Sequence, residues 1–269
     1  MVVFPNAKIN IGLQIIEKRP DGYHNLASCF YPVGWSDVLE ILPATTTTFQ
    51  STGIPIPGNI EGNLCLKAYR NLQQVYDLPP VQIHLHKVVP IGAGLGGGSA
   101  DGAFTIKALN QLFHLGLSIE QMEAFARPLG SDCAFFIQNQ PRYCFEKGDQ
   151  FESIALSLSG KQIVLVNPNV HISTAEAYSG VKPHLPTVEL REALSQPIEN
   201  WKNLIFNDFE ANLLSKYPVI TSIKENLYEL GAVYVSMTGS GSTVYGIFEK
   251  FSNFTEKFSN YTVWQGNLI

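Results

Sequence analysis

Apolar and polar residues alternate in the first segment of the chain, which is the pattern of a half-buried strand. The apolar positions are Ile9, Ile11, Leu13 and Ile15, and the positions between them are Lys8, Asn10, Gly12 and Gln14. Because side chains two apart share a face, Lys8 and Asn10 are expected to project together from the less apolar side. A turn at 19–22 and a second strand over 25–33 are predicted to follow.

The rest of the first half mixes strand and helix patterns. Strands are predicted at 38–42, 45–49 and 81–86, with a loop at 54–58. Helices are predicted near 63–76, after residue 102, and from Ser118 until Pro128 ends the pattern. Ser118 and Gln121 have the spacing of a capping box.

A small, polar stretch at 157–160 separates this half from a second series of elements. Strands are predicted at 163–166, 232–236 and 243–248, and a short helix and a strand at 261–264 end the chain. Helices are predicted from residues 173, 187 and 207 onward and over 218–230. Mixed strands and helices in both halves indicate an α+β protein with two domains, 1–157 and 158–269.

Composition and charge narrow the class of protein. Hydrophobic residues make up 45% of the 269 positions, which is enough for a sizeable buried core. The net charge is −5 and no run of Lys or Arg occurs, so nucleic acid is not expected as a partner. The chain shows neither a basic and apolar leader nor an apolar stretch of about 18 residues, so we expect a cytoplasmic protein without a membrane partner. The sequence does not indicate an oligomeric state.

Cysteine and histidine spacing gives no metal signature. The four cysteines have no C-x-x-C pair, so free, buried thiols are predicted. His84 and His86 share a face of a predicted strand, but the sequence supplies no third ligand near them. We therefore expect surface histidines and no protein-held metal.

Glycine is concentrated in one window of eleven residues. Its members are Gly92, Gly94, Gly96, Gly97, Gly98 and Gly102, and they lie between a predicted strand and a predicted helix. A loop of this kind lets backbone N–H groups converge on an anion at the positive end of a helix, so it predicts a phosphate site.

Several kinds of phosphate loop can be compared with this window. No Gly-Lys followed by Ser or Thr occurs, which excludes a Walker A loop. Residues 92–97 satisfy G-x-G-x-x-G, but residues 114–118 join two predicted helices where a dinucleotide fold needs a second strand and an acid. The H-R-D and D-F-G motifs of protein kinases are also missing.

The window resembles the loop of the GHMP kinase superfamily, P-x-x-x-G-L-G-x-x-[SA], over residues 90–99. Residues 6–13 and 18–24, which include Asp21-Gly22-Tyr23-His24, are similar to the amino-terminal motif of the branch whose acceptor carries a cytidine diphosphate. Residues 237–242 are similar to its third motif. This chain departs from the family at Asn6, where Pro is usual, at Ala100, where Ser is common, and at 133–134, where Val-Pro is common.

The resemblance implies a two-domain GHMP kinase fold, with an N-terminal α/β domain and a C-terminal ferredoxin-like domain. It also implies ATP-dependent phosphorylation of the 2-hydroxyl of a methylerythritol that carries cytidine diphosphate, a step toward isoprenoid precursors. A kinase of another small alcohol, such as mevalonate or homoserine, is the nearest alternative. A dinucleotide-dependent oxidoreductase and a non-catalytic nucleotide-binding module are more distant ones.

The resemblance assigns catalysis to Lys8 and Asp132. Asp132, within 130–136, would be the general base, although Asp after Ser is also a common helix N-cap. Lys8 would keep Asp132 ionised and neutralise the transferring phosphoryl group. Magnesium is expected to arrive with ATP, and we assign it no protein ligand.

The resemblance divides the binding residues into two sets. The ATP phosphates would be wrapped by Pro90, Gly92, Ala93, Gly94, Leu95, Gly96, Gly97, Gly98 and Ser99, with Lys87 and Asn63 near the adenine. For the acceptor, Asn10 would orient the hydroxyl, Tyr23 and Tyr178 would sandwich the pyrimidine, and His24 and Thr174 would supply hydrogen bonds. Gly239 and Ser240 would approach the phosphates or the methylerythritol end.

Overall fold

The computed structural model describes residues 1–250 and 254–268, which form two compact units. The first unit comprises residues 1–7, 36–91 and 96–140, and the second comprises 8–35, 92–95 and the chain from 141 onward. The predicted boundary after residue 157 lies inside the second unit. It therefore stays a prediction about sequence domains, because the compact units are interleaved along the chain.

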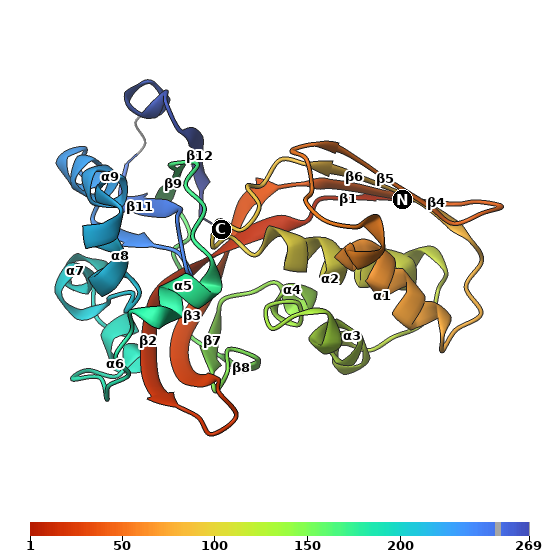
Figure 1. Ribbon diagram of the computed structural model, residues 1–269, viewed down its shortest axis with the longest axis horizontal. Coiled ribbons are helices and arrows are strands. Elements are labelled where there is room, and N and C mark those ends of the chain that lie inside the picture. The colour runs from red at the N-terminus through yellow and green to blue at the C-terminus, as the bar shows by residue number, and fades with distance from the viewer. Residues whose placement is uncertain (251–253, 269) are drawn as a thin grey trace. The chain divides into compact units, whose positions relative to one another are not determined.

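The first unit is a four-stranded sheet with helices packed on one face (Figure 1). The strand order is β1 (Val2–Val3), β4 (Val38–Pro43), β6 (Val81–Lys87) and β5 (Thr48–Gly53), with only the β5–β6 pair parallel among the described strands of this sheet. The helices are η1 (Ile60–Gly62), α1 (Leu64–Gln73), α2 (Gly97–Leu112), α3 (Ile119–Ala126), η2 (Arg127–Leu129) and α4 (Phe135–Gln138). Burial alternates along β6, and α2 contacts β1, β4 and α1.

The second unit contains two further four-stranded sheets. One has the order β2 (Asn6–Lys18), β3 (His24–Ser36), β7 (Arg142–Phe145) and β8 (Gln150–Ser153). The other is antiparallel, in the order β10 (Tyr234–Met237), β11 (Val244–Phe248), β9 (Gln162–Asn167) and β12 (Thr262–Asn267). The helices are α5 (Thr174–Ser179), α6 (Leu190–Leu194), η3 (Ile198–Asn200), α7 (Trp201–Leu204), α8 (Glu210–Lys216), α9 (Pro218–Glu229) and η4 (Thr255–Phe258), with α9 packed on β10 and β11.

The first strand is present, but the prediction that it is half-buried was wrong. Lys8 is 3% exposed and Asn10 is 2% exposed, although both lie on the face that carries the polar residues. That face is covered within the second unit, because a Cβ on Gly12 would lie 2.6 Å from Leu190 and 2.8 Å from Ile205. At Gly12 this cover therefore comes from residues 178 and 193 positions away in the chain.

Several other predictions can be compared with the structure. The strand predicted at 45–49 begins only at Thr48, because Thr45 and Thr46 form a bend. The short strands β7 and β8 were missed, since they lack clear alternation and depend on pairing with β3. The capping box of Ser118 and Gln121 is confirmed, with both of its hydrogen bonds present.

Surface and buried groups also follow the predictions in part. All four cysteines are free and buried. His84 and His86 both hydrogen-bond to Thr52 at 3.0 Å, on the face of the first sheet opposite its buried residues. Within residues 1–250 and 254–268, no helix is both long enough and apolar enough to cross a membrane.

Candidate functional site

The glycine window begins with a backbone that only glycine adopts readily. Gly92, Gly94 and Gly96 have φ values of 65°, 79° and 70°, in the left-handed region. A Cβ on Gly94 would also lie 2.0 Å from the carbonyl oxygen of Thr238, within the second unit. Gly96 is the N-cap of α2, so the predicted order of strand, glycine loop and helix is confirmed.

The part of the window in the first unit is open to a ligand at Gly98. This residue is exposed, and a Cβ there would meet no atom within 4 Å. Ser99 beside it is half-buried, and both lie in the first turn of α2, a helix of 16 residues. Unpaired N–H groups and the positive end of the helix dipole make this turn suitable for an anion.

Lys87 lies beneath this turn in a buried cluster of charges. Its ammonium donates to Asp37 and, at 2.8 Å, to Asp101, while Asp37 also accepts the N–H groups of Val88 and Val89. Burial raises the pKa of Asp101 to about 8, against the opposing effect of Lys87. The raised pKa is consistent with the environment of Asp101 Oδ1, which is buried and has no hydrogen-bond partner among the described residues.

Both residues predicted near the adenine therefore have structural contacts. A Cβ on Gly97 would lie 3.0 Å from Lys87 Nζ, so the lysine fills the space under the loop. Asn63 is the N-cap of α1 and accepts the N–H of Cys65 at 2.9 Å. The sequence did not indicate these roles, and a contact of either side chain with adenine stays a prediction.

Asp132 lies in the loop before α4 in the first unit. The hydroxyl of Ser131 donates to its Oδ1 at 3.2 Å, and the N–H of Cys133 donates to Gly130 at 3.1 Å. The N-cap of α4 is Ala134, and no side chain caps that helix. The alternative role of Asp132 as N-cap of this helix was therefore wrong.

Cys133 connects this loop to the glycine window. Its buried side chain shares a hydrogen bond with Ser99, and burial raises the pKa of the thiol to about 11 despite that bond. A Cβ on Gly130 would lie 3.3 Å from the sulfur and 3.8 Å from Ser99 Oγ. The first unit thus brings together the candidate base loop and the hydroxyl of the phosphate loop.

Lys8 and Asn10 form a pair in the second unit, as the strand pattern predicted. The Lys8 ammonium donates to Asn10 Oδ1 and lies 4.3 Å from the ring centroid of Phe30. Asn10 Nδ2 donates to Ser28 Oγ at 2.9 Å, and this hydroxyl donates to the carbonyl of Gly12 at 2.7 Å. The orientation of the Asn10 amide is therefore fixed by a donor on one side and an acceptor on the other.

The loop after β10 is joined to the glycine window within the second unit. The Thr238 hydroxyl donates to the carbonyl of Gly94 at 2.9 Å and accepts the N–H of Asn10 at 3.0 Å. Gly239 follows with φ 54°, and its Cβ would lie 3.2 Å from Gly94 Cα. The structure thus places Gly239 against Gly94, whereas any contact of Ser240 with a ligand stays a prediction.

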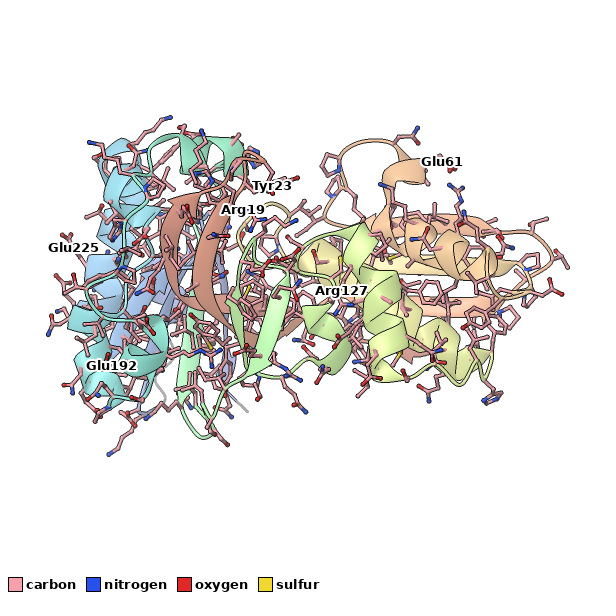
Figure 2. All side chains as sticks on the ribbon, turned by 90° about the horizontal axis from the view of Figure 1, so that it is seen from below. Arg19, Tyr23, Glu61, Arg127, Glu192 and Glu225 are labelled. Atoms are coloured by element: carbon pink, nitrogen blue, oxygen red, sulfur yellow. The ribbon has the colours of Figure 1, made fainter. Side chains whose placement is uncertain are left out.

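Aromatic rings meet in the second unit in a different pairing from the predicted one. His24 stacks on Tyr178 with centroids 4.7 Å apart and planes at 21°, and Phe209 contacts the Tyr178 ring edge-on at 4.9 Å. Tyr23 is 62% exposed, and Figure 2 shows it at the hairpin of β2 and β3. The structure therefore pairs Tyr178 with His24 at a spacing that leaves no room for a base between these two rings, and a sandwich of the pyrimidine by Tyr23 and Tyr178 stays a prediction.

The surroundings of these rings affect their chemistry. Burial and the charge of Lys18 lower the pKa of His24, which favours the neutral imidazole near pH 7. Thr174 is exposed at the start of α5, where a ligand can reach it. Ser173 accepts the N–H of Glu176 at the start of this helix, and the Glu176 carboxylate pairs with Lys216 and Tyr217.

Four residues near these groups were not predicted: Ser28, Thr238, Asn207 and Phe209. Thr238 lies inside the motif at 237–242, so its position was marked although its role was not. Asn207 and Phe209 belong to the run Asn207-Asp208-Phe209-Glu210, which the sequence indicated only as the start of a helix. The signal in the sequence for a functional role of this run was its composition, because two acids and an amide surround one aromatic residue at the start of a predicted helix.

Comparison with known proteins supports the resemblance to GHMP kinases in both the N-terminal and the C-terminal part of the chain. The model of the GHMP kinases N terminal domain matches residues 63–140, and that of the GHMP kinases C terminal domain matches residues 189–260. A 4-diphosphocytidyl-2-C-methyl-D-erythritol kinase of Cytophaga hutchinsonii is 53% identical, with 97% of each chain covered. One of Bacteroides thetaiotaomicron is 50% identical, with 100% of this chain and 98% of that one covered.

Solved structures agree with these matches. A crystal structure of a 4-(cytidine 5'-diphospho)-2C-methyl-D-erythritol kinase superposes with a TM-score of 0.81 at 28% identity, over 99% of this chain and 98% of that one. The mevalonate kinase of Methanococcus jannaschii superposes with a TM-score of 0.69 at 15% identity, over 100% and 98% of the two chains. The second likeness shows a shared fold alone.

Proposed function

Because this chain belongs to the 4-diphosphocytidyl-2-C-methyl-D-erythritol kinase family of GHMP kinases, we propose that it phosphorylates the alcohol in that family's name. The γ-phosphoryl group of ATP would pass to the 2-hydroxyl, and ADP would leave. The reaction is a step toward isoprenoid precursors by the non-mevalonate route.

The stack of His24 on Tyr178 is the observation in the structure that carries this proposal. Mevalonate- and homoserine-type acceptors have no base, so a kinase for them has no use for an aromatic surface beside the acceptor site. The cytosine would lie on an outer face of this stack, and Tyr23, which is 62% exposed at the hairpin, would cover it. The exposed hydroxyl of Thr174 would hydrogen-bond to the base, while His24 would support Tyr178 by stacking.

Asp132 would act as the general base. Its carboxylate would accept the proton of the 2-hydroxyl while that oxygen forms a bond to the γ-phosphorus and the bond to the ADP oxygen breaks. Its half-buried position supports this role, since it limits competition from water while leaving the carboxylate reachable. Asn10 would orient the acceptor hydroxyl, with its amide held by Ser28.

Charge on the transferring group would be balanced by Lys8 and by the first turn of α2. A mostly desolvated ammonium interacts strongly with developing negative charge, and Lys8 is 3% exposed. The backbone from Gly96 to Ser99 would bind the ATP phosphates, because the open side of Gly98 allows a close approach. Magnesium would enter as part of the nucleotide substrate, and the described residues contain no group of three or more His, Cys, Asp and Glu side chains suited to a metal.

The proposal is tested by offering the purified protein ATP with one acceptor at a time. We expect phosphate transfer to the diphosphocytidyl alcohol, detected by the mass of the product, and none to mevalonate or homoserine. CDP is expected to raise the temperature of unfolding, whereas ribose 5-phosphate, which lacks a base, is not. Transfer to mevalonate in place of the diphosphocytidyl alcohol would establish the alternative function.

The Asp132→Asn variant tests the base. The amide has the shape of the carboxylate but accepts no proton at neutral pH, so kcat is expected to fall by about 100- to 10,000-fold. Nucleotide affinity, measured by calorimetry, is expected to change less than about twofold. Wild-type turnover by this variant would remove Asp132 from the mechanism.

A further inference from the structure

Residues 207–210 connect the loop after α7 to the first residue of α8, and they contact several parts of the second unit. Its backbone runs beside β2, where the N–H of Leu13 donates to Phe206 and the N–H of Asp208 donates to Leu13, both at 2.9 Å. Asn207 and Phe209 are each 2% exposed, and Glu210 is 8% exposed. Their side chains therefore serve packed neighbours rather than solvent.

Asn207 binds the backbone at the start of the third motif, residues 237–242, where β10 ends. Its Nδ2 donates both protons, at 2.8 Å each, to the carbonyls of Met237 and Gly239. Its Oδ1 accepts the N–H of Phe209 at 3.1 Å. Glu210 accepts the N–H of Met237 at 2.6 Å, so both backbone polar groups of Met237 are bound by this segment.

These bonds extend to the glycine window. Thr238, between the two carbonyls that Asn207 binds, donates to Gly94 and accepts from Asn10. Movement of the backbone at 237–239 would shift the Gly94 carbonyl and the strand that carries Lys8 and Asn10. Asn207 therefore acts on the phosphate end of the site through Thr238.

Phe209 acts at the other end of the site. Its ring contacts Tyr178 edge-on, and Tyr178 stacks on His24. The neighbouring Asp208 accepts the N–H of Ile15 at 2.7 Å, which fixes the segment to the strand that carries Asn10. The distance from the base-binding rings to Asn10 is thus set partly by four consecutive residues.

We propose that Asn207 and Phe209 are positioning residues of the same reaction, Asn207 for the phosphoryl-transfer end and Phe209 for the base end. Neither side chain would touch a substrate. The assignment rests on the proposed function, since it presumes an acceptor that carries a base. It predicts that the two residues affect different kinetic parameters although they are only two positions apart.

The Asn207→Asp variant tests the phosphoryl end. The carboxylate keeps the size of the amide and still accepts from Phe209, but it presents an oxygen to two carbonyls. We expect kcat to fall about 10- to 100-fold with the acceptor KM changed less than twofold, as a small misplacement of reacting groups would produce. Thr238→Val, which removes the link to Gly94, is expected to show the same split.

Acidification should partly restore Asn207→Asp. The two carbonyls and the Glu210 carboxylate favour the protonated form of the new acid, and this form can donate to one carbonyl; Lys224, paired with Glu210, opposes the effect. The ratio of wild-type to variant kcat is therefore expected to shrink as pH falls from 8.5 to 6. The matched control is Asn167→Asp, because the buried Asn167 amide donates to the Thr243 hydroxyl, which can reverse its bond.

The Phe209→Leu variant tests the base end. We expect the acceptor KM to rise about 2- to 10-fold, the range for loss of one edge-on ring contact, with kcat and the KM for ATP within twofold. Phe248→Leu removes the same atoms from another buried site of the second unit and is expected to leave both KM values unchanged. Circular dichroism at the assay temperature shows whether each variant is folded.

Two kinds of measurement distinguish a failure of this inference from a failure of the proposed function. Wild-type turnover of the diphosphocytidyl alcohol tests the function by itself. The ratios of kcat and KM between each variant and the wild type test positioning. The increases in unfolding temperature caused by CDP and by ATP report on the base end and the phosphoryl-transfer end separately, even without turnover. Equal changes of both KM values in Phe209→Leu, or an Asn207→Asp variant with normal kcat at every pH, would overturn the inference.

Discussion

Lys8 and Lys87 are both 3% exposed, and each contacts a different half of the glycine window in its own unit. Lys87 lies under Gly97 and pairs with two carboxylates, Asp37 and Asp101. Lys8 donates its backbone N–H to Leu95 at 2.9 Å, and its ammonium contacts an amide oxygen and the face of Phe30. Burial alone therefore does not distinguish a structural lysine from a candidate catalytic one.

The groups around each ammonium make the difference. The Asp37 carboxylate and the Asp101 carboxyl group bind Lys87 inside the fold, and removal of the lysine would leave both buried without their cation. The Lys8 ammonium donates to an amide oxygen and lies over the face of a ring, and both contacts stabilise its charge. Lys87 is therefore expected to matter most for stability and Lys8 most for phosphoryl transfer.

The largest expected effect belongs to Lys8→Met. The thioether fills most of the space of the lysine but carries no charge, so kcat is expected to fall about 100- to 1000-fold. The free energy of unfolding, measured in urea, is expected to fall by about 2 kcal/mol, within the range for a hydrogen bond to a charged group. A large loss of stability with normal kcat would reverse the contrast with Lys87.

Lys87→Met is expected to act in the opposite way. It should lower the free energy of unfolding by about 3 kcal/mol, because two buried carboxyl groups lose their cation. Lys107→Met is the control from α2, since Lys107 is half-buried over the ring of Phe104, and its unfolding free energy is expected to change by less than about 1 kcal/mol. Equal losses in the two variants would show that the carboxylates do not matter.

Gly98→Ala and Gly94→Ala compare the two halves of the window itself. Alanine at Gly98 has room and favours a helix, so stability is expected to be equal or higher by about 0.5 to 1 kcal/mol, while the KM for ATP rises because the Cβ obstructs the phosphates. Alanine at Gly94 clashes with Thr238 and should destabilise the protein. Both quantities can be measured by urea unfolding and steady-state kinetics. An unchanged KM for ATP in Gly98→Ala would show that the ATP phosphates do not bind at the surface of Gly98.

Asp101→Asn is expected to change how stability depends on pH. The pKa of this carboxyl is raised to about 8 from its usual value of 3.8, so the folded state holds a proton that the unfolded state has lost between these pH values. The free energy of unfolding should therefore fall as pH rises toward 8, by up to about 1.4 kcal/mol per pH unit, and Asn should abolish this slope. Parallel profiles of wild type and variant between pH 6 and 8.5 would contradict a neutral Asp101.

The sequence by itself determined the features that are encoded locally. Alternation along residues 8–15 predicted the strand and the pairing of Lys8 with Asn10, and the spacing of Ser118 and Gln121 predicted a helix start. The glycine window predicted its own position between strand and helix, because a left-handed φ at Gly92, Gly94 and Gly96 is a property of single residues. Three short motifs also identified the family.

Only the tertiary structure decided what surrounds these groups. Leu190 and Ile205 cover the polar face of the first strand at Gly12. Asp37 and Asp101 pair with the Lys87 ammonium. The ring of Phe209 packs edge-on against Tyr178, on which His24 stacks. Each of these contacts joins residues far apart in the chain, and no periodicity records them. Burial, ion pairing and ring stacking depend on which distant side chains arrive in the same place, whereas turns, caps and strand faces depend on neighbours in the sequence.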